Sequence, residues 1–293
     1  MIAFVEKVIT DKLGHLLPEG SKLVFLKLCT PTSGKTLNDK VIFLVFKKGE
    51  DKPFLCVKTV RSYGAREIIV KNFNNLKTLH NLVEDSQFAD MFVTPLYLHD
   101  DGEFVFSIET ACIGTKMVSN EENFKKVLQQ HIALHAYLAK KNPEARDVVS
   151  DVKGLIAELG LESADETDLF TYIDGLNLSI KLPKIIQHGD MTFDNLLGSS
   201  RGLCVVDYDF VGVTDVPGFD LFGFCKRFYR KGEILAQCKK CLKDYFTAIS
   251  VVLSDEEIHG LCFLYHAVEY LKRKPSGIGN LTAKKIISDF EAL

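Results

Sequence analysis

The chain has 293 residues, 46% of them apolar and 26% charged, which excludes a fibrous or disordered protein. Its net charge of −3 argues against a nucleic-acid-binding surface. The longest clean apolar run, residues 41–46, is far too short to cross a bilayer. Because Glu6 and Lys7 interrupt the first apolar residues, we expect no secretory signal and a cytoplasmic protein without a membrane span.

From residue 22 to about 109, short β-branched and aromatic runs alternate with turn-forming segments. The pattern predicts five strands, mostly in antiparallel hairpins: KLVFLKLC, VIFLVFK, FLCVKTV, FVTPLYL and EFVFSIE. Between the third and fourth of these runs, apolar residues recur at helical spacing over 66–83. One helix is therefore predicted within this β-rich part.

From residue 119 onward the apolar period is helical. Ser119 with Glu122, and Ser254 with Glu257, have the spacing of capping boxes, so we expect a helix to begin at each, the second running to about residue 273. An exception is residues 195–210, which read as two short strands around a Gly-Ser-Ser-Arg-Gly turn.

These patterns predict an α+β chain of two lobes. Residues 1–112 form a β-rich lobe, and residues 113–293 form a mainly helical one. The eight cysteines lie mostly in apolar runs, as reduced thiols do. Cys238 and Cys241 have C-x-x-C spacing, but no second pair or matching histidines lie nearby, so we predict neither a disulfide framework nor a zinc site.

The most informative stretch is HGDMTFDNLL at 188–197, followed by CVVDYD at 204–209. Asp190 precedes Asn195 by five residues, and Asp207 ends an apolar strand twelve residues later. Phosphoryl transfer from ATP requires such a set: one carboxylate to orient or deprotonate an acceptor hydroxyl, and a second carboxylate with an amide oxygen to hold Mg²⁺. The hairpin between them brings Asn195 back toward Asp207 in this prediction.

The motif HGD-x-x-x-x-N, followed by an apolar strand ending in D-x-D, resembles the signature of the aminoglycoside phosphotransferase and choline kinase superfamily, which has a protein-kinase-like bilobal fold. The resemblance covers most of the chain. It implies that Asp190 is the catalytic base, that Asn195 and Asp207 bind Mg²⁺, that His188 shapes the catalytic loop and that Asp220 braces this loop. It also implies ATP or GTP as the phosphate donor.

On the third predicted strand, Lys58 stands where a kinase's lysine grips the α- and β-phosphates. Alone, it would be a surface lysine. Its partner should be a glutamate on the next helix, and Glu67 is the one acid between residues 52 and 84 exclusive. We therefore expect an ion pair between Lys58 and Glu67.

In this family the segment after the fifth strand is the hinge, so the backbone of Glu109, Thr110 and Ala111 is expected to read the adenine edge. PTSGKT at 31–36 ends like a Walker A loop, but position 29 is cysteine and a strand follows, so that reading fails. We expect this turn to close over the phosphates with Thr32, Ser33 and Gly34.

Several features favour a small-molecule acceptor over a protein. HGD stands in place of the kinase HRD, DYD in place of DFG, and no A-P-E follows. Residues 143–220 hold 5 basic and 15 acidic side chains, a net charge of −10, so a hydroxylated amine is one prediction. A solvent-facing acidic surface is the alternative. A neutral sugar, amino acid or saccharide acceptor, or a catalytically silent nucleotide-binding pseudokinase, also remains open.

Overall fold

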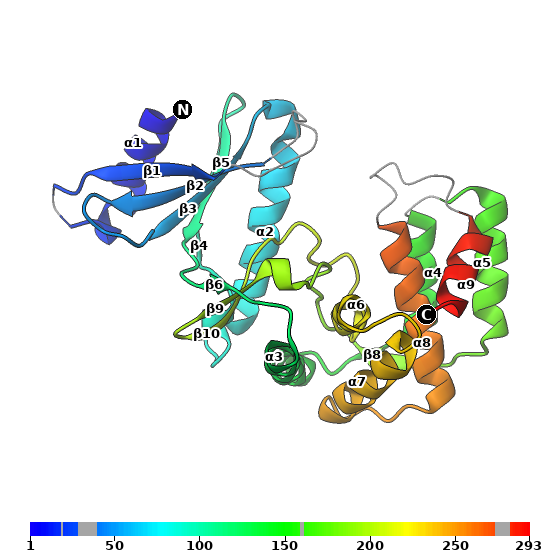
Figure 1. Cartoon of the computed structure of the whole chain (residues 1–293). Helices are drawn as coiled ribbons and strands as arrows, with labels where there is room; N and C mark the ends of the chain where they lie inside the picture. The colour runs from blue at the N-terminus through cyan, green and yellow to red at the C-terminus, as the bar shows by residue number, and fades with distance from the viewer. Residues whose placement is uncertain (19, 29–39, 159–160, 273–281) are drawn as a thin grey trace. The chain divides into compact units, whose positions relative to one another are not determined.

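The computed structural model describes the whole chain except residues 19, 29–39, 159–160 and 273–281. The chain divides into two compact units (Figure 1). The first unit comprises residues 1–116 and 196–209, and the second comprises residues 117–195 and 210–293. The predicted lobe boundary, after residue 112, lies close to this division, but most of the predicted hairpin belongs to the first unit.

The first unit is built on an antiparallel sheet in the order β1-β2-β3-β5-β4. These strands are β1 (Leu23–Leu28), β2 (Lys40–Lys47), β3 (Leu55–Val60), β4 (Pro95–Asp100) and β5 (Val105–Thr110). Each overlaps one of the predicted runs, so the prediction of five strands in this part is confirmed. The turns between β2 and β3 and between β4 and β5 each contain glycine and aspartate, residues that favour tight turns.

The two faces of β2 differ, because side chains alternate along a strand. Val41, Phe43 and Val45 are buried in a core shared with helix α1 (Ile2–Leu13). On the opposite face of the same strand stand Lys40 and Ile42, and Ile42 is paired with Lys58 of β3. The two lysines thus share the face that does not hold this core.

Helix α2 (Arg66–Val83) buries an apolar stripe that contains Ile69, Phe73 and Leu76. It contacts β3, β4 and β5, which confirms the predicted helix between the third and fourth strands. The hairpin of β9 (Leu196–Ser199) and β10 (Gly202–Val205) is also confirmed, and β9 pairs with the two-residue strand β6 (Thr115–Lys116) (Figure 1). Short 3₁₀ segments lie at Gly14–Leu16, Tyr63–Ala65 and Ala89–Met91.

The second unit is mainly helical. Its helices are α3 (Glu121–Lys141), α4 (Val148–Glu158), α5 (Ser163–Gly175), α6 (Phe219–Phe228), α7 (Ile234–Ala248), α8 (Asp255–Leu271) and α9 (Ala283–Glu291). A small two-stranded sheet joins β7 (Ala145–Asp147) to β8 (Lys181–Pro183), and a 3₁₀ turn covers Phe193–Asn195. No helix of the described residues is both long and apolar enough to cross a membrane.

The two predicted capping boxes have different outcomes. Ser254 and Glu257 form a complete box at the start of α8, as expected. At α3 the prediction was wrong by one residue, because Asn120 is the N-cap and its side chain accepts a hydrogen bond from the Asn123 backbone. Asparagine caps a helix as well as serine does, so the neighbouring asparagine displaces Ser119 from this role.

Candidate active site

Two acids follow strand β10 in the first unit, and a lysine lies between them. Nζ of Lys40 is 2.6 Å from Oδ1 of Asp207 and 2.6 Å from Oδ2 of Asp209. Asp207 has a φ of 67°, in the left-handed region that aspartate tolerates better than most residues. Burial lowers the pKa of Lys40, but attraction by the two carboxylates outweighs this and raises the pKa overall. Lys40 is therefore charged at neutral pH.

A chain of polar contacts runs from this acid pair into the sheet. Oδ1 of Asp209 accepts a hydrogen bond of 2.6 Å from the amide of Asn72 on α2. The amide oxygen of Asn72 in turn accepts from Nζ of Lys58 at 3.2 Å, and Lys58 is 2.8 Å from Oε1 of Glu109. The side chains of Lys58 and Glu109 are only 7% and 5% exposed, so this ion pair is fixed in the interior.

The predicted ion pair between Lys58 and Glu67 was wrong. Glu67 is 74% exposed and pairs with its neighbour Arg66 at 2.7 Å. The first turn of α2 carries Glu67 away from the sheet, and the residue of α2 that faces Lys58 is Asn72, over a turn further along. The acid that neutralises Lys58 comes instead from β5, the strand hydrogen-bonded to β3.

The expected hinge has part of its backbone already committed within the first unit. The N–H of Thr110 donates to the carbonyl of Thr94, and the N–H of Ala111 donates to the carbonyl of Phe54, both at 3.0 Å. The carboxylate of Glu109 is held by Lys58. Adenine recognition by this segment stays a prediction, and it would have to use groups other than these two N–H donors.

In the second unit, the catalytic loop predicted from HGD-x-x-x-x-N is closed by its own asparagine. Nδ2 of Asn195 donates to the backbone carbonyl of Asp190 at 2.9 Å and to its Oδ2 at 3.2 Å. These bonds leave the amide oxygen of Asn195 for another partner. Asp190 and Asn195 belong to the second unit and Asp207 to the first, so the shared metal site of Asn195 and Asp207 stays a prediction.

The buried carboxylate of Asp220, in the first turn of α6, holds the start of this loop. It accepts hydrogen bonds from the backbone N–H of His188 at 2.5 Å and of Gly189 at 2.7 Å. Gly189 has a φ of +82°, and a Cβ there would lie 2.2 Å from the carbonyl oxygen of Phe210. The HGD motif therefore requires glycine at this position for both conformation and space.

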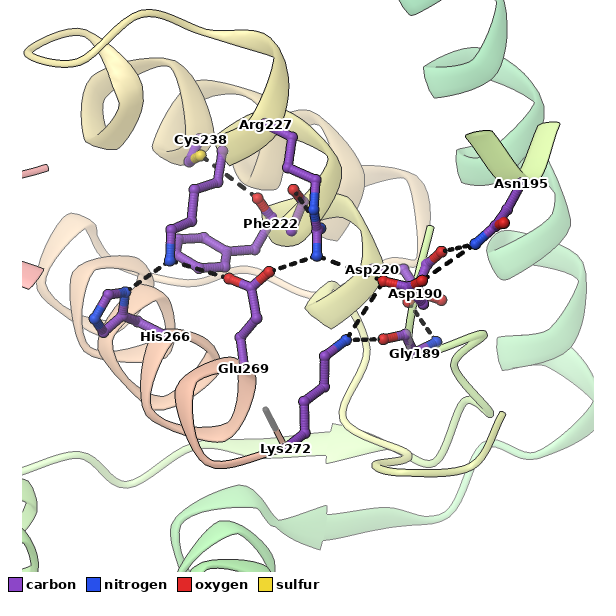
Figure 2. Close-up of polar contacts among 12 residues, drawn as sticks. Gly189, Asp190, Asn195, Asp220, Phe222, Arg227, Cys238, His266, Glu269 and Lys272 are labelled. Atoms are coloured by element: carbon purple, nitrogen blue, oxygen red, sulfur yellow. Dashed lines mark hydrogen bonds and ion pairs between the residues drawn. The ribbon is translucent and has the colours of Figure 1, made fainter. Parts of the chain in front are cut away.

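Cations from two helices approach Asp190 (Figure 2). Nη2 of Arg227, on α6, lies 3.6 Å from its Oδ1, and Nζ of Lys272, just after α8, lies 3.9 Å from the same atom. The ammonium of Lys272 also donates to the backbone carbonyl of Gly189. Burial lowers the pKa of Lys272, while the negative charge of Asp190 acts to raise it.

Glu269 on α8 anchors this group of cations. Its carboxylate accepts from Lys226 at 3.0 Å and pairs with Nη2 of Arg227 at 2.8 Å, and its side chain is only 3% exposed. Lys226 also contacts Nδ1 of His266 at 3.0 Å. Figure 2 shows the resulting chain of contacts from His266 through Glu269 and Arg227 to Asp190. A buried acid thus sets the position of the guanidinium beside the predicted base.

Buried histidines from α3 approach Asp220 inside the second unit. The ligand atoms of His131, His135 and Asp220 lie within 4.8 Å of one another, an arrangement that could hold a metal ion. Nδ1 of His135 contacts the Tyr245 hydroxyl at 2.8 Å. Burial lowers the pKa of His131 to about 4 and that of His135 well below its usual value, so both rings are neutral at pH 7. Since Asp220 already binds the loop, we interpret the cluster as its packing support.

A cavity in the first unit lies away from these residues. It measures about 650 Å³, and its lining includes Phe54, His80, Ala111 and Arg201. Lys40, Lys58, Asp207 and Asp209 do not line it. Its volume therefore gives no information about the acid pair.

Some candidate residues fall outside what the structure describes, and others were missed. Thr32, Ser33 and Gly34 lie in the segment 29–39, outside the described residues. The lysine between the two acids, Lys40, was missed, although it shares a strand face with the position opposite Lys58. Asn72, Arg227 and Glu269 carry no motif, because each is brought to its site by helix packing.

The fold can be compared with solved structures. It is similar to a thermostable mutant of the aminoglycoside phosphotransferase APH(4)-Ia, with a TM-score of 0.60 and 11% identity over 98% of this chain and 97% of that one. It is similar to a choline kinase from Streptococcus pneumoniae (0.53, 16%, 98% and 98%) and to an ethanolamine kinase from Plasmodium vivax (0.53, 10%, 99% and 86%). These similarities confirm the protein-kinase-like fold.

Comparisons at the level of sequence are negative. No protein-family model matches the chain, and a search of curated proteins finds no match.

Proposed function

We propose that this protein is an ATP- and Mg²⁺-dependent phosphotransferase that transfers the γ-phosphate to a hydroxyl group of a small molecule. The observation that carries the proposal is the pair Asp207 and Asp209 at the end of β10, with a cation held between them at 2.6 Å from each, in a protein-kinase-like fold. Solved structures of this fold include enzymes of this class bound to AMP or to ADP.

The donor set fits Mg²⁺, which prefers carboxylate and amide oxygens. The fit is supported by Lys40, whose ammonium already lies between the two carboxylates as a stand-in cation. In the proposed site Asp207 and the amide oxygen of Asn195 hold the metal. When bound, Mg²⁺ neutralises the charge of the triphosphate and orients it for transfer.

The proposed base is Asp190. Its task is to accept the proton of the acceptor hydroxyl and to orient that oxygen toward the γ-phosphate. Such work requires a fixed carboxylate, and the loop is fixed by Asp220 at its start and by Asn195 at its end. Arg227, held by Glu269, adds a positive charge near the place where negative charge would accumulate.

The acceptor class stays a prediction. A hydroxylated amine such as an amino sugar, an aminoglycoside, choline or ethanolamine matches the acidic segment 143–220 and the substrates named for several structures of this fold. A neutral sugar, amino acid or saccharide is the second candidate. A pseudokinase is disfavoured because Lys58, Asp190, Asn195 and Asp207 are all present.

Thermal melting and an acceptor screen test the proposal. We expect ATP to raise the melting temperature only when Mg²⁺ is present, and Asp207→Ala to abolish this shift by removing a metal ligand. A coupled ADP-release screen across hydroxylated amines, sugars and amino acids should then find an acceptor. Asp190→Asn should keep the Mg²⁺-dependent shift but lose transfer by about 10²- to 10⁴-fold, the usual contribution of a general base.

Asp168→Asn, which removes an exposed carboxylate on α5, is the matched control and should behave as the wild type. If the wild type shows no Mg²⁺-dependent stabilisation by ATP or GTP, the proposed function is wrong. Unchanged turnover in Asp190→Asn would remove the role assigned to that residue.

A further inference from the structure

Lys40 and Lys58 of the first unit are held in different ways. Lys58 lies in the interior, between Glu109 and Asn72, and its Nζ is also 5.3 Å from the ring centre of Tyr208. Lys40 is the first residue of β2, and its partners Asp207 and Asp209 are 43% and 29% exposed. A solvent-accessible ion pair contributes little to stability and can exchange partners, whereas a buried pair cannot be separated without a large cost.

The contacts of Lys58 fix its ammonium in one place, so a phosphate would have to approach it there. Moving its ammonium to a phosphate would leave the carboxylate of Glu109, 5% exposed, without its cation. Lys40 has no such cost. Its own anions are the proposed metal ligand Asp207 and its neighbour Asp209, whose negative charge a bound Mg²⁺ would offset.

The backbone also places Lys40 suitably. Lys40 is paired with Val60, and Ile42, two residues along, is paired with Lys58, so the two lysines point to the same face of the sheet. The polar chain from Lys58 through Asn72 and Asp209 ends at Lys40. The outermost cation of this chain is therefore the more exposed one.

We propose that Lys40 is a phosphate-binding lysine of this protein: without nucleotide it neutralises Asp207 and Asp209, and when Mg²⁺ and ATP bind it moves from these carboxylates to the triphosphate. Lys58 stays between Glu109 and Asn72 in both states. The inference rests on the proposed function, because it takes a nucleoside triphosphate with Mg²⁺ as the ligand.

Binding measurements on Lys40→Met test this without any acceptor. Removing the ammonium leaves two carboxylates unneutralised, so we expect Mg²⁺ alone to bind the variant more tightly than the wild type. The affinity for ATP with Mg²⁺ should fall by about tenfold or more, as for the loss of one charge-assisted hydrogen bond. Lys47→Met, at the other end of β2, is the matched control and should change neither value.

The outcomes separate the two hypotheses. If Lys40→Met binds ATP with Mg²⁺ as tightly as the wild type does, while Asp207→Ala does not bind it, the role of Lys40 is wrong and the proposed function stands. If the wild type itself binds no nucleotide with Mg²⁺, the proposed function fails first. Weaker binding of Mg²⁺ alone by Lys40→Met would also overturn the inference, since Lys40 would then not be competing with the metal.

Discussion

The first and second units both place a lysine or arginine against the acids proposed for catalysis, but they hold that cation differently. In the first unit Lys40 bridges two partly exposed acids and has no buried partner among its ion pairs. In the second unit Arg227 approaches Asp190 while a buried acid, Glu269, binds the same guanidinium nitrogen more closely, at 2.8 Å against 3.6 Å. Lys40 can therefore be displaced from its acids more easily than Arg227 can be displaced from Glu269.

This difference matches the work proposed for each unit. Metal and nucleotide must enter and leave, so a displaceable cation suits the acid pair of the first unit. A base must hold one position while a proton is transferred, so a fixed surrounding suits Asp190. The difference between the two cations can be measured as a change in the free energy of unfolding, because removing one partner of a buried ion pair destabilises a protein more than removing one partner of an exposed pair.

The largest effect is expected in the second unit. Glu269→Gln should lower the free energy of unfolding by about 3 kcal/mol, because Lys226 and Arg227 would lose the buried charge that neutralises them both. Urea denaturation of the wild type and the variant measures this loss of stability. Transfer should fall as well, since Arg227 is no longer held beside Asp190.

Glu256→Gln, an exposed acid of the same helix, provides the control and should change stability by less than about 1 kcal/mol. If Glu269→Gln unfolds at the same urea concentration as this control, the buried anchor described for Arg227 does not exist.

The sequence predicted well what depends on neighbours along the chain. The strands of the first sheet, helix 66–83 and the capping box at Ser254 were found because alternation, helical period and capping are local patterns. The wrong pair of Lys58 and Glu67 shows the limit. Glu67 is the one acid close to Lys58 along the sequence, but the partner of Lys58 comes from β5, a strand that the fold places beside β3.

The next prediction concerns the stability of the protein at low pH, which depends on a buried histidine of the second unit. His131 has its pKa lowered to about 4 by burial, so the folded protein keeps it neutral while the unfolded chain takes up a proton near pH 6.5. Its contribution to stability is therefore complete above pH 6.5 and is lost as the pH falls toward 4. Between pH 7 and pH 5 the loss is about 2 kcal/mol.

Denaturation of the wild type and of His131→Leu at both pH values measures this contribution. The variant has no group to protonate at this position, so its stability should fall by less between pH 7 and pH 5. Parallel losses in the two proteins would mean that His131 is already accessible to protons in the folded state.

The candidate site was predicted unevenly for a related reason. Asp190, Asn195 and Asp220 carry motif spacing, and Asp220 and Asn195 hydrogen-bond to residues of the loop predicted to be catalytic. Arg227 and Glu269 come from different helices, α6 and α8, and neither belongs to a sequence motif. Only the packing of α6 against α8 brings them to Asp190.

The smallest effect is expected at the acid pair of the first unit. Asp209→Asn removes one partner of Lys40, but Asp207 remains at 2.6 Å, and the amide oxygen of the new side chain can still accept from Asn72. Because this pair is partly exposed, stability should change by less than about 1 kcal/mol in either direction. Urea denaturation of Asp209→Asn and Glu269→Gln under the same conditions compares the two changes in stability. A loss as large as that of Glu269→Gln would show that Lys40 is fixed in place, and the contrast between a displaceable and a fixed cation would then be wrong.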